Sequence, residues 1–427
     1  MRKLFPLWLL IAGTLYAQEV VHVIQIDGVI NPVAQNFIHN NIEKAEEANA
    51  HALVIMLDTP GGLMKSMRMI VKDMLTASIP IVVYVAPSGS RAGSAGVFIT
   101  LAAHVAAMAP GTNIGAAHPV AFGMGADTSQ TMMEKVTNDA VAFIKSIAEK
   151  RGRNVEWAEQ AVRKSVSITE TEALELNVID FIAPTLDSLL VLMDGMEVET
   201  SQGKVTLHTR NARIKRIEMS FRYRVLNVIS DPNVAYILML IGIYGILFEL
   251  YNPGSIFPGV IGAISLILAF YALQTLPINY AGLLLIILAI ILFLLEIKIP
   301  SYGLLTIGGI VSLVLGSLML FESPLPFLRV SWKVIAAATL TTALFFLFAI
   351  GMGIRAQRKK PTTGSEGLVG EFGEAIETFR KGAGQVMVHG EIWKAKSRDT
   401  IRKGDPIRVT RVDGLHLRVQ KVDEETE

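Results

Sequence analysis

Hydrophobic residues follow three different patterns along the chain, and each pattern predicts a different kind of structure. Over residues 19–195, apolar runs such as 20–28 and 51–62 alternate with segments such as 31–50, whose apolar positions recur at helical spacing. The runs are apolar throughout rather than at every second position, which is typical of strands buried on both faces. This part therefore predicts an α/β domain with a mostly parallel sheet. A β-hairpin is expected directly after it, over 196–210.

The second pattern consists of long apolar segments, and it predicts a membrane region. Each segment approaches the roughly 20 residues that a helix needs to cross a bilayer. We expect five spans, near residues 234–250, 256–275, 280–297, 302–321 and 333–354. Two hairpins repeat, because "FELYNPGSIFPGVIGAISLIL" aligns with "LEIKIPSYGLLTIGGIVSLVL" and places Glu249 on Glu296. These glutamates either mark a polar path or support the Pro-containing turns beside them, and their position favours the structural role.

The third pattern is the strand-like alternation of a polar tail, residues 365–427, and it predicts a small β-barrel. The expected strands lie within 368–378, 384–397, 406–414 and 415–422, and Gly or Asp residues separate them. Five strands fit this length. Small barrels of this kind can bind nucleic acid, but beyond Trp393 the tail shows no basic and aromatic stacking surface. A protein-interaction or regulatory role is therefore favoured.

The two ends of the chain predict how it is oriented in a membrane. Residues 1–17, "MRKLFPLWLLIAGTLYA", carry two basic residues and then an apolar run, as a secretory signal peptide does. The alternative is an uncleaved anchor helix, and either would export the α/β domain. The last apolar segment ends in "RAQRKK", a basic flank typical of the cytoplasmic side. Five spans after an exported domain also end in the cytoplasm, so the two arguments agree.

One basic patch disagrees with this charge rule. It lies between the hairpin and the first span, on the exported side, where the rule expects few basic residues. The patch consists of Arg210, Arg213, Lys215, Arg216, Arg222 and Arg224. Three explanations are open. The patch belongs to the folded exported domain, or it forms a surface that binds lipid headgroups, or the number of spans differs from five.

Composition narrows the classes of function. The 427 residues are 51% hydrophobic, which is too apolar for an ordinary soluble protein of this length and supports the membrane region. A formal net charge of +1 gives no indication of a nucleic-acid partner. The chain has no cysteine, which excludes disulfides, thiolate metal sites and cysteine nucleophiles. The sequence has neither a metal-binding histidine spacing nor a P-loop, so we expect no metal or nucleotide cofactor.

Candidate chemistry lies where the predicted strands end. The motif "DTPGG" (58–62) ends one strand with two glycines, and "GSAG" (93–96) places Ser94 where a loop enters a helix. A serine there is exposed, and the free amides of the helix N-terminus favour negative charge. The amides of Gly62 and Ala95 are therefore candidates for an oxyanion hole in acyl transfer. The alternative is that Ser94 is only the N-cap of that helix.

Three stretches together resemble a known group of enzymes. They are "LDTPGGL", "PSGSRAGSAGVFITLAAHVAAMAPGTNIGAAHPV" and "ITETEALELNVID", and they are similar to the Clp-protease-like, crotonase-fold serine peptidases. The whole chain resembles the long form of the NfeD family. In that family such a peptidase precedes a membrane region with an "EIKIPSYGLL" type of motif, and a small OB-fold domain ends the chain. The resemblance covers nearly all of the chain after the signal peptide and implies that Ser94 is the nucleophile.

The resemblance implies Lys135, in "MMEKVTND", as the base that activates Ser94, because it matches the lysine of a Ser–Lys dyad. A lysine is a base at neutral pH only when apolar surroundings lower its pKa, and most helix lysines are merely solvated. Candidates for such surroundings are Met132, Met133, Val136 and Val141. The preceding loop, 121–131, is flexible in composition, so we expect it to be mobile without substrate and to position the lysine on binding.

Two histidines are alternative bases. His104 lies ten residues along the predicted helix from Ser94, about 15 Å away, and is therefore out of reach. His118 matches the triad histidine of soluble Clp proteases by resemblance. The third residue of that triad, an Asp, is missing here, since Ser165 stands at about its place. Without an acid to orient and stabilise it, a histidine is a less convincing base.

We therefore expect a membrane-anchored serine endopeptidase without a cofactor. The expected fold is an α/β spiral domain of the Clp and crotonase type, then an α-helical transmembrane bundle, then a small all-β OB-fold barrel. The expected domains are a signal peptide (1–17), the peptidase (18–200), a linker with the basic segment (201–230), the transmembrane region (231–356) and the barrel (362–427).

The resemblance also implies the partners. They are a peptide or protein substrate with a hydrophobic segment, a stomatin- or prohibitin-like membrane protein, membrane lipid, and further copies of the chain in at least a dimer. No nucleic acid is expected. The peptidase would lie outside the cytoplasmic membrane, in the periplasm or extracellular space, and the barrel in the cytoplasm. The rival interpretation is a membrane scaffold without catalysis that organises stomatin-type assemblies.

Overall fold

The computed structural model describes residues 19–120, 130–358 and 367–422, apart from positions 252, 275, 277, 300, 302, 322, 324 and 325. The predicted signal peptide and most of the loop over 121–131 lie outside the described residues. By its internal contacts the chain divides into two compact units. One comprises residues 1–296 and 301–339, and the other comprises 297–300 and 340–427.

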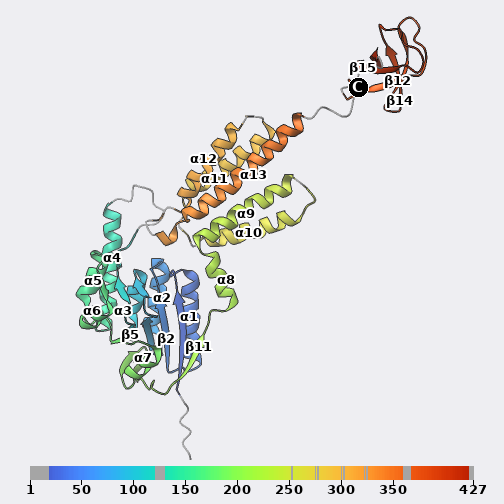
Figure 1. The fold of residues 1–427 in the computed structure, drawn as a ribbon. Coiled ribbons are helices and arrows are strands. Elements are labelled where there is room, and N and C mark those ends of the chain that lie inside the picture. Colours follow the sequence, from blue (N-terminus) through green and yellow to red (C-terminus); the bar gives the residue numbers. More distant parts are fainter. Residues whose placement is uncertain are drawn as a thin grey trace, which may run out of the picture. The chain divides into compact units, whose positions relative to one another are not determined.

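A six-stranded, fully parallel sheet forms the centre of the α/β domain (Figure 1). Its strand order is β11-β1-β2-β3-β5-β8. The strands are β1 (Val20–Asp27), β2 (Ala52–Asp58), β3 (Ile81–Val85), β5 (Val105–Met108), β8 (Phe181–Ile182) and β11 (Arg213–Ile217). The helices are α1 (Pro32–Glu47), α2 (Met64–Thr76), α3 (Ala95–Ala102), α4 (Gln130–Lys150), α5 (Val155–Arg163), α6 (Glu170–Glu175) and α7 (Leu186–Leu192). The predicted alternation of strands and helices is therefore what the structure shows.

Side chains alternate between two hydrophobic clusters, one on each face of the sheet. On β2, for example, Leu53 and Ile55 join the cluster that includes residues of α1 to α5, whereas Val54 joins the cluster that includes residues of α7. All three side chains are fully buried. Because both faces are covered, the strands need apolar residues at every position, which explains the continuous apolar runs of the sequence.

A second, three-stranded sheet adjoins the ends of the first. It consists of β4 (Arg91–Gly93), β6 (Asn113–Gly115) and β7 (Ser167–Thr169), with β4 parallel to β6 and β6 antiparallel to β7. A single bridge between Thr59 and Ala92 connects it to the chain that leaves β2. This small sheet carries Gly93, the residue directly before Ser94, so it helps to determine where the candidate nucleophile lies.

The α/β domain extends past the predicted boundary at residue 200. β9 (Glu197–Thr200) and β10 (Gly203–Thr206) form the predicted hairpin, and β11 then joins the central sheet beside β1. A cut at residue 200 would divide the hairpin and remove an edge strand. Three residues of the basic patch, Arg213, Lys215 and Arg216, lie in β11. Charged residues on an edge strand oppose pairing with other chains, which accounts for this half of the patch within the folded domain.

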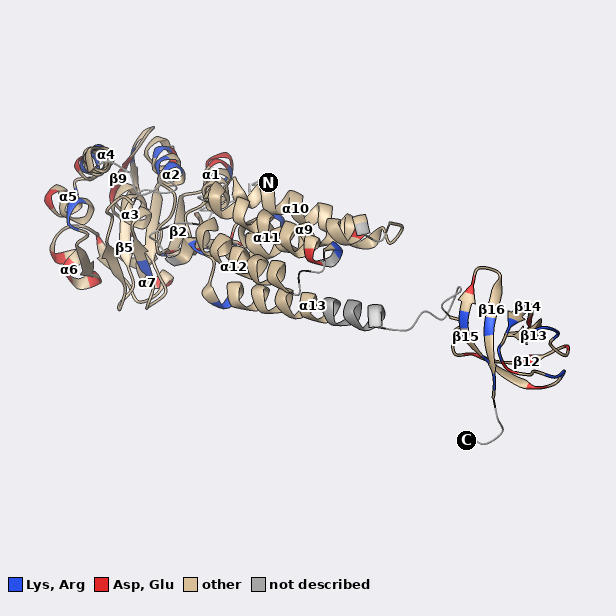
Figure 2. Cartoon of the chain, turned by 90° about the horizontal axis from the view of Figure 1, so that it is seen from above, with Lys and Arg blue, Asp and Glu red and all other residues tan. Residues whose placement is uncertain are grey.

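The central helical region follows the predicted apolar segments. It contains α8 (Phe221–Ile229), α9 (Pro232–Tyr251), α10 (Phe257–Leu273), α11 (Tyr280–Lys298), α12 (Leu304–Leu320) and α13 (Trp332–Arg358). Figure 2 shows that Lys, Arg, Asp and Glu are sparse on α9 to α13 and frequent elsewhere. Within the described part of the chain, one helical stretch, Pro232–Leu250, is both long and apolar enough to cross a membrane, and four shorter apolar stretches lie in the other helices.

The repeated glutamates support turns, as their position predicted. The carboxylate of Glu296, at the end of α11, accepts hydrogen bonds from the Ser301 hydroxyl (2.6 Å) and from the amides of Gly303 and Thr306 (3.0 Å each). It thereby satisfies donors at the start of α12. Glu249 accepts equivalent bonds from Gly254 and Ser255 in the repeated turn. Both carboxylates are thus used to hold a helical hairpin together.

The tail folds into the predicted small barrel. It is closed by five strands in the order β12-β13-β14-β16-β15, which is consistent with an OB-fold. The strands are β12 (Phe372–Ala375), β13 (Ala383–Val388), β14 (Glu391–Lys396), β15 (Pro406–Asp413) and β16 (His416–Lys421). Alternate residues, such as Val386 and Val388, point into its core, which explains the alternating pattern of the sequence.

One buried ion pair provides a test of the α/β domain. The guanidinium of Arg153, whose side chain is 2% exposed, lies 2.9 Å from the Asp180 carboxylate, which also accepts the Ala106 amide (2.7 Å). Asp180→Ala leaves a buried cation unpaired, so we expect a fragment spanning residues 19–231 to lose about 3 kcal/mol of unfolding free energy in urea. Glu197→Ala, which removes the exposed Lys204–Glu197 pair, should change it by less than about 0.5 kcal/mol. Equal losses in the two variants would contradict the assignment.

Candidate active site

Ser94 occupies the junction between β4 and α3, as the sequence predicted, but its hydroxyl does not cap the helix. Its backbone has φ 51° and ψ −109°, a conformation that residues other than glycine rarely adopt. The side chain makes no capping hydrogen bond to α3, and the described residues provide no partner for its Oγ. The N-cap explanation of this serine therefore lacks its defining bond. What remains is a strained, partly exposed hydroxyl at a helix N-terminus.

The "DTPGG" segment lies directly against the segment that carries Ser94. The Thr59 amide donates to the Arg91 carbonyl (2.8 Å), and the Gly93 amide donates to the Thr59 carbonyl (2.9 Å). The Asp58 carboxylate accepts the Arg91 amide (3.0 Å) and so fixes the same contact from a side chain. The two motifs that the sequence placed at strand ends are therefore neighbours in space.

Glycine is required where these segments meet. A Cβ atom on Gly61 would lie 2.6 Å from the Cβ of Ser94, and φ at Gly61 is +122°. A Cβ on Gly96 would lie 2.7 Å from the Thr59 methyl group. Any larger side chain would push the two segments apart. The glycines of the two motifs thus serve close backbone approach.

The candidate oxyanion amides are at the same place. Ile30 pairs with the glycine loop through the Gly61 carbonyl (2.8 Å) and the Leu63 amide (2.9 Å). Gly62 lies between Gly61 and Leu63, and in this parallel pairing its N–H does not bond to Ile30. Ala95 is the first residue of α3, so its N–H has no acceptor within the helix. Both amides thus keep the free donors that an oxyanion hole needs.

His118 lies on the segment that pairs with β4 and is held by a backbone carbonyl. The Ser94 amide donates to the Gly115 carbonyl (3.0 Å), three residues before this histidine. The Nδ1 atom of His118 is 2.9 Å from the Val162 carbonyl oxygen. A carbonyl can only accept, so Nδ1 is the donor in this contact, and Nε2 takes no part in it. A neutral carbonyl cannot stabilise an imidazolium as a carboxylate does, so the missing acid is not replaced.

His104 has a structural role. It is 7% exposed, and its Nδ1 accepts the Ile81 amide (3.1 Å). Burial, reinforced by the nearby Arg151 charge, lowers the pKa of His104 to about 3. This histidine therefore stays neutral at physiological pH and holds the start of β3.

Lys135 is exposed on the first part of α4, and no described residue forms a hydrogen bond or an ion pair with it. The helix contributes to the hydrophobic core only from Ala140 onward. Of the proposed apolar neighbours, Met132 is 44% exposed, Met133 and Val136 are half-buried, and Val141 is buried in the core. The structure therefore places Lys135 on a helical extension of the domain, and the loop expected to move lies mostly outside the described residues.

A contact that sequence reasoning missed connects α3 to α4. Phe98, one turn beyond Ser94, stacks on Phe143 of α4, with ring centroids 6.0 Å apart. The guanidinium of Arg68, from α2, lies 4.4 Å above the Phe143 ring and is paired with Asp139, one turn beyond Lys135. Nothing local in the sequence connects these three helices. Their packing sets the rotation of α4, and hence the direction in which Lys135 is presented.

Comparison with known proteins covers the chain in three parts. Residues 20–191 match the model of the NfeD1b N-terminal domain, residues 233–351 the NfeD integral membrane domain, and residues 365–421 the NfeD-like C-terminal, partner-binding domain. The membrane-bound protease PH1510 of Pyrococcus horikoshii is 36% identical over 95% of this chain and 94% of its own length. The membrane protein NfeD1b of Bacillus subtilis is 27% identical over 95% of this chain and 93% of its own.

Two similar solved structures are of a protease fragment described as 1510-N, a membrane-bound stomatin-specific protease. A lysine-to-alanine mutant in complex with a substrate peptide is 36% identical and covers 50% of this chain and 98% of that one, with a TM-score of 0.47. A serine-to-alanine mutant is 37% identical and covers 48% and 100%, with a TM-score of 0.45.

The class of a membrane-bound serine protease fits an α/β domain in which the described residues leave a serine hydroxyl at a helix N-terminus without a partner, followed by an integral membrane domain. The near-complete relation to a membrane-bound protease agrees with that class. The chain belongs to the NfeD family. The resemblance found in the sequence is thereby confirmed.

The contact between Gly61 and Ser94 generates a prediction with a matched control. Gly61→Ala places a Cβ against Ser94, so we expect peptide cleavage to fall at least tenfold, roughly the effect of displacing a nucleophile by about 1 Å. Gly28 has a similar φ of +117° but no atom within 4 Å of its would-be Cβ. Gly28→Ala should therefore introduce similar backbone strain and lower the thermal unfolding temperature by a similar amount. It should keep most of the cleavage activity. The idea fails if both variants lose activity equally.

Proposed function

We propose that this protease is an endopeptidase that uses Ser94 as nucleophile and Lys135 as general base. The observation that carries the proposal is the strained backbone of Ser94 at the start of α3. Its hydroxyl forms no capping bond to the helix and lies against the Gly61 backbone. Strain of this kind persists where the surrounding structure holds a residue in a functional conformation. The amides of Gly62 and Ala95 are the proposed oxyanion donors.

The proposed reaction is acyl transfer in two halves. The neutral amine of Lys135 takes the Oγ proton of Ser94, and Oγ forms a bond to the substrate carbonyl carbon. The negative oxygen is stabilised by the amides of Gly62 and Ala95. The C–N bond then breaks, and the leaving amine takes the proton from the lysine ammonium. In the second half, water gives a proton to Lys135 and attacks the carbonyl carbon of the acyl-enzyme. The ester C–Oγ bond then breaks, and the lysine ammonium returns its proton to Oγ, which releases the acid and restores Ser94.

Substrate is proposed to complete the site. An exposed lysine is protonated and cannot serve as a base at neutral pH. Lys135 and Met132 both lie on the exposed start of α4, beside the half-buried Met133 and Val136. An apolar substrate segment laid on this surface would exclude water from the amine and favour its neutral form. This accounts for the proposed preference for hydrophobic segments.

The proposed substrate or partner is a stomatin- or prohibitin-like membrane protein. Solved relatives of the peptidase part are described as stomatin-specific, and the barrel matches a partner-binding domain. The similarity to the related membrane-bound protease extends over 95% of this chain, so it spans the peptidase, membrane and barrel parts of this chain. We also propose that the peptidase domain associates into at least a dimer and that the chain contacts lipid.

Two alternatives remain distinguishable by experiment. His118 is a second candidate base, because its Nε2 is left free by the bond from Nδ1 to Val162. A scaffold without catalysis would share the fold and use the barrel to organise stomatin-type assemblies.

Point variants test the catalytic residues. In detergent-solubilised protein incubated with a hydrophobic peptide, Ser94→Ala and Lys135→Ala should each lower the cleavage rate by about a thousandfold or more, because each removes one half of the dyad. Lys164→Ala, which removes an ordinary lysine of the same domain, is the control and should keep its activity. Thermal unfolding of every variant shows whether it is folded.

Three other results would change the assignment. Cleavage by Ser94→Ala at the normal rate would remove the nucleophile from the proposal. Full activity of Lys135→Ala together with loss in His118→Ala would transfer the base to His118. No cleavage by the unmodified protein at any pH tested would favour the scaffold.

The proposed topology has five spans, with the peptidase outside and the barrel inside the cytoplasmic membrane. The basic flank 355–360, which begins in the last turn of α13, supports a cytoplasmic end. An odd number of spans then places residues before α9 on the opposite side. Reporter fusions check this. Alkaline phosphatase should be active when fused after residue 225 and inactive after residue 360, and a fluorescent protein should show the reverse. The same result at both positions would mean an even number of spans.

A further inference from the structure

The short helix α8 joins the α/β domain to the membrane region. It runs from Phe221 to Ile229, and only Ser230 and Asp231 separate it from α9. Nine residues of α-helix extend about 14 Å. α9 contains the one described stretch that is long and apolar enough to cross a membrane. The end of α8 is therefore within two residues of the point where the chain reaches the bilayer.

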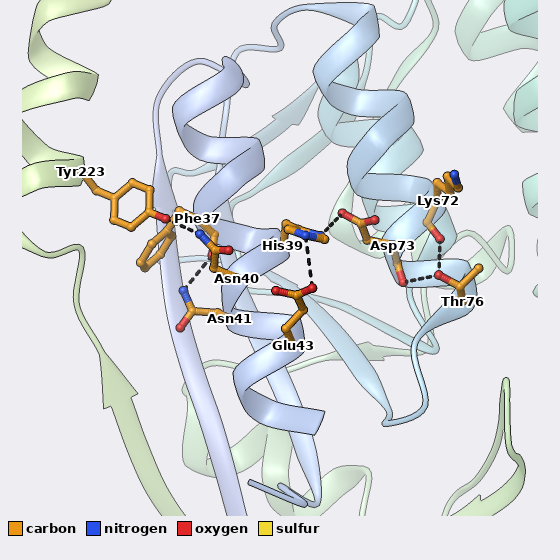
Figure 3. Close-up of polar contacts among 9 residues, drawn as sticks. All are labelled: Phe37, His39, Asn40, Asn41, Glu43, Lys72, Asp73, Thr76 and Tyr223. Atoms are coloured by element: carbon orange, nitrogen blue, oxygen red, sulfur yellow. Dashed lines mark hydrogen bonds and ion pairs between the residues drawn. The ribbon is translucent and has the colours of Figure 1, made fainter. Parts of the chain in front are cut away.

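The face of α8 that contacts the α/β domain is held by polar groups. Tyr223 accepts a hydrogen bond from the Asn40 side chain of α1, and its ring packs edge-on against Phe37 at 5.4 Å (Figure 3). Four residues further along, the Asn227 side-chain oxygen accepts a bond from Asn31 (2.9 Å). Both residues lie on one side of the helix, since positions four apart share a face. This side docks on α1.

The opposite face of α8 is apolar and exposed. Phe221, Val225 and Val228 are 79%, 36% and 58% exposed, and their spacing of four and then three residues aligns them in one stripe. Arg222 and Arg224, both exposed, flank this stripe on its two sides, because each residue turns the helix by about 100°. Phe221 and Val228 are thus more than half exposed, Val225 is exposed in part, and Ile229 at the end of the helix is buried.

This distribution is the reverse of the one that water favours. A helix at the surface of a soluble domain places its apolar stripe on the domain and its polar face outward. Here asparagine and tyrosine groups face the domain, and phenylalanine and valine face outward. An apolar stripe flanked by basic residues is the pattern of helices that lie in the plane of a membrane surface.

We propose that α8 lies on the membrane surface, with Phe221, Val225 and Val228 in the boundary between headgroups and acyl chains and with Arg222 and Arg224 on lipid phosphates. Continuity with α9 places the helix at that depth. A second copy of the chain is the less suitable occupant. A two-fold contact through this stripe would bring four arginines together and would be opposed by their repulsion.

The attachment would also hold the peptidase site close to the membrane. Asn31, the partner of Asn227, follows Ile30, which is hydrogen-bonded to both Gly61 and Leu63. α8 is thus connected through two residues to the loop that carries the proposed oxyanion donor Gly62. This consequence rests on the proposed function, whereas the membrane contact of α8 does not. It would favour cleavage of substrates at the bilayer surface.

The absence of cysteine from the chain allows a direct test in the full-length protein. Val225→Cys and Val228→Cys would each carry a nitroxide label in proteoliposomes of phosphatidylcholine and phosphatidylglycerol. We expect both labels to collide more often with oxygen than with a nickel chelate and to lie roughly 5–10 Å below the phosphates. Lys204→Cys, on the exposed hairpin, is the aqueous control and should favour the nickel chelate. Ile241→Cys, on the exposed side of α9, is the lipid control.

Two results would overturn the proposal. Labels on α8 that are as accessible to the nickel chelate as the Lys204 label would place the stripe in water. Labels shielded from both reagents, with strong dipolar coupling between copies, would place it in a protein interface. A further experiment combines Arg222→Gln with Arg224→Gln. The label at position 225 should then lie less deep in anionic vesicles, and its depth should change less in vesicles of phosphatidylcholine alone. Since no readout involves cleavage, failure here leaves the proposed catalysis untouched.

Discussion

Around Ser94, two segments from different sheets lie so close that no side chain fits between them. The chain leaving β2 runs parallel to β4, and the two are joined by backbone hydrogen bonds between Thr59, Arg91 and Gly93. Gly61 provides the close approach, since its would-be Cβ collides with Ser94. This contact places the strained Ser94, whose hydroxyl does not cap α3, beside the glycine loop that carries the Gly62 amide. The small second sheet brings β4 to this place, since β4 lies outside the central sheet.

The proposed site has two parts, one in the buried sheets and one exposed. Ser94 and the glycine loop belong to the buried sheets, whereas Lys135 lies on the part of α4 that precedes its core contacts at Ala140. The stacked Phe98 and Phe143, with Arg68 above, connect the two parts. In the proposed dyad, catalysis would depend on bringing this exposed amine into apolar surroundings, which a bound hydrophobic substrate could do. This links the chemistry of the base to the kind of substrate.

The distribution of apolar residues in the rest of the chain fits two surroundings, water and lipid. The α/β domain and the barrel bury apolar residues in their own cores, whereas α9 to α13 leave large apolar residues exposed, as helices in lipid do. The buried carboxylate of Glu296 is tolerated because it accepts donors at the start of α12. At the border between the two solvents, α8 has a polar face on the protein and an apolar face outward. In the proposed arrangement, one side of this short helix is attached to the α/β domain and the other side to the bilayer.

The sequence by itself determined the elements that depend on local pattern. Continuous apolar runs predicted the buried parallel strands, long apolar segments predicted the helical region, and alternation predicted the five-stranded barrel, because hydrophobic periodicity reports burial directly. It also placed Ser94 at a strand-to-helix junction and the glutamates in turns. The assignment of Lys135 came from family resemblance, and it stays a prediction.

Tertiary structure alone decided the features that join distant residues. β11 was hidden in a basic patch, because an edge strand keeps charges that a central strand cannot bury. The polar docking of α8 on α1, the stack of Phe98 and Phe143, and the carbonyl partner of His118 connect positions far apart in sequence, so no local period signals them. The free hydroxyl of Ser94 belongs with them. Whether a serine at a helix start caps the helix depends on its backbone angles, and those of Ser94 (φ 51°, ψ −109°) are given by no local sequence pattern.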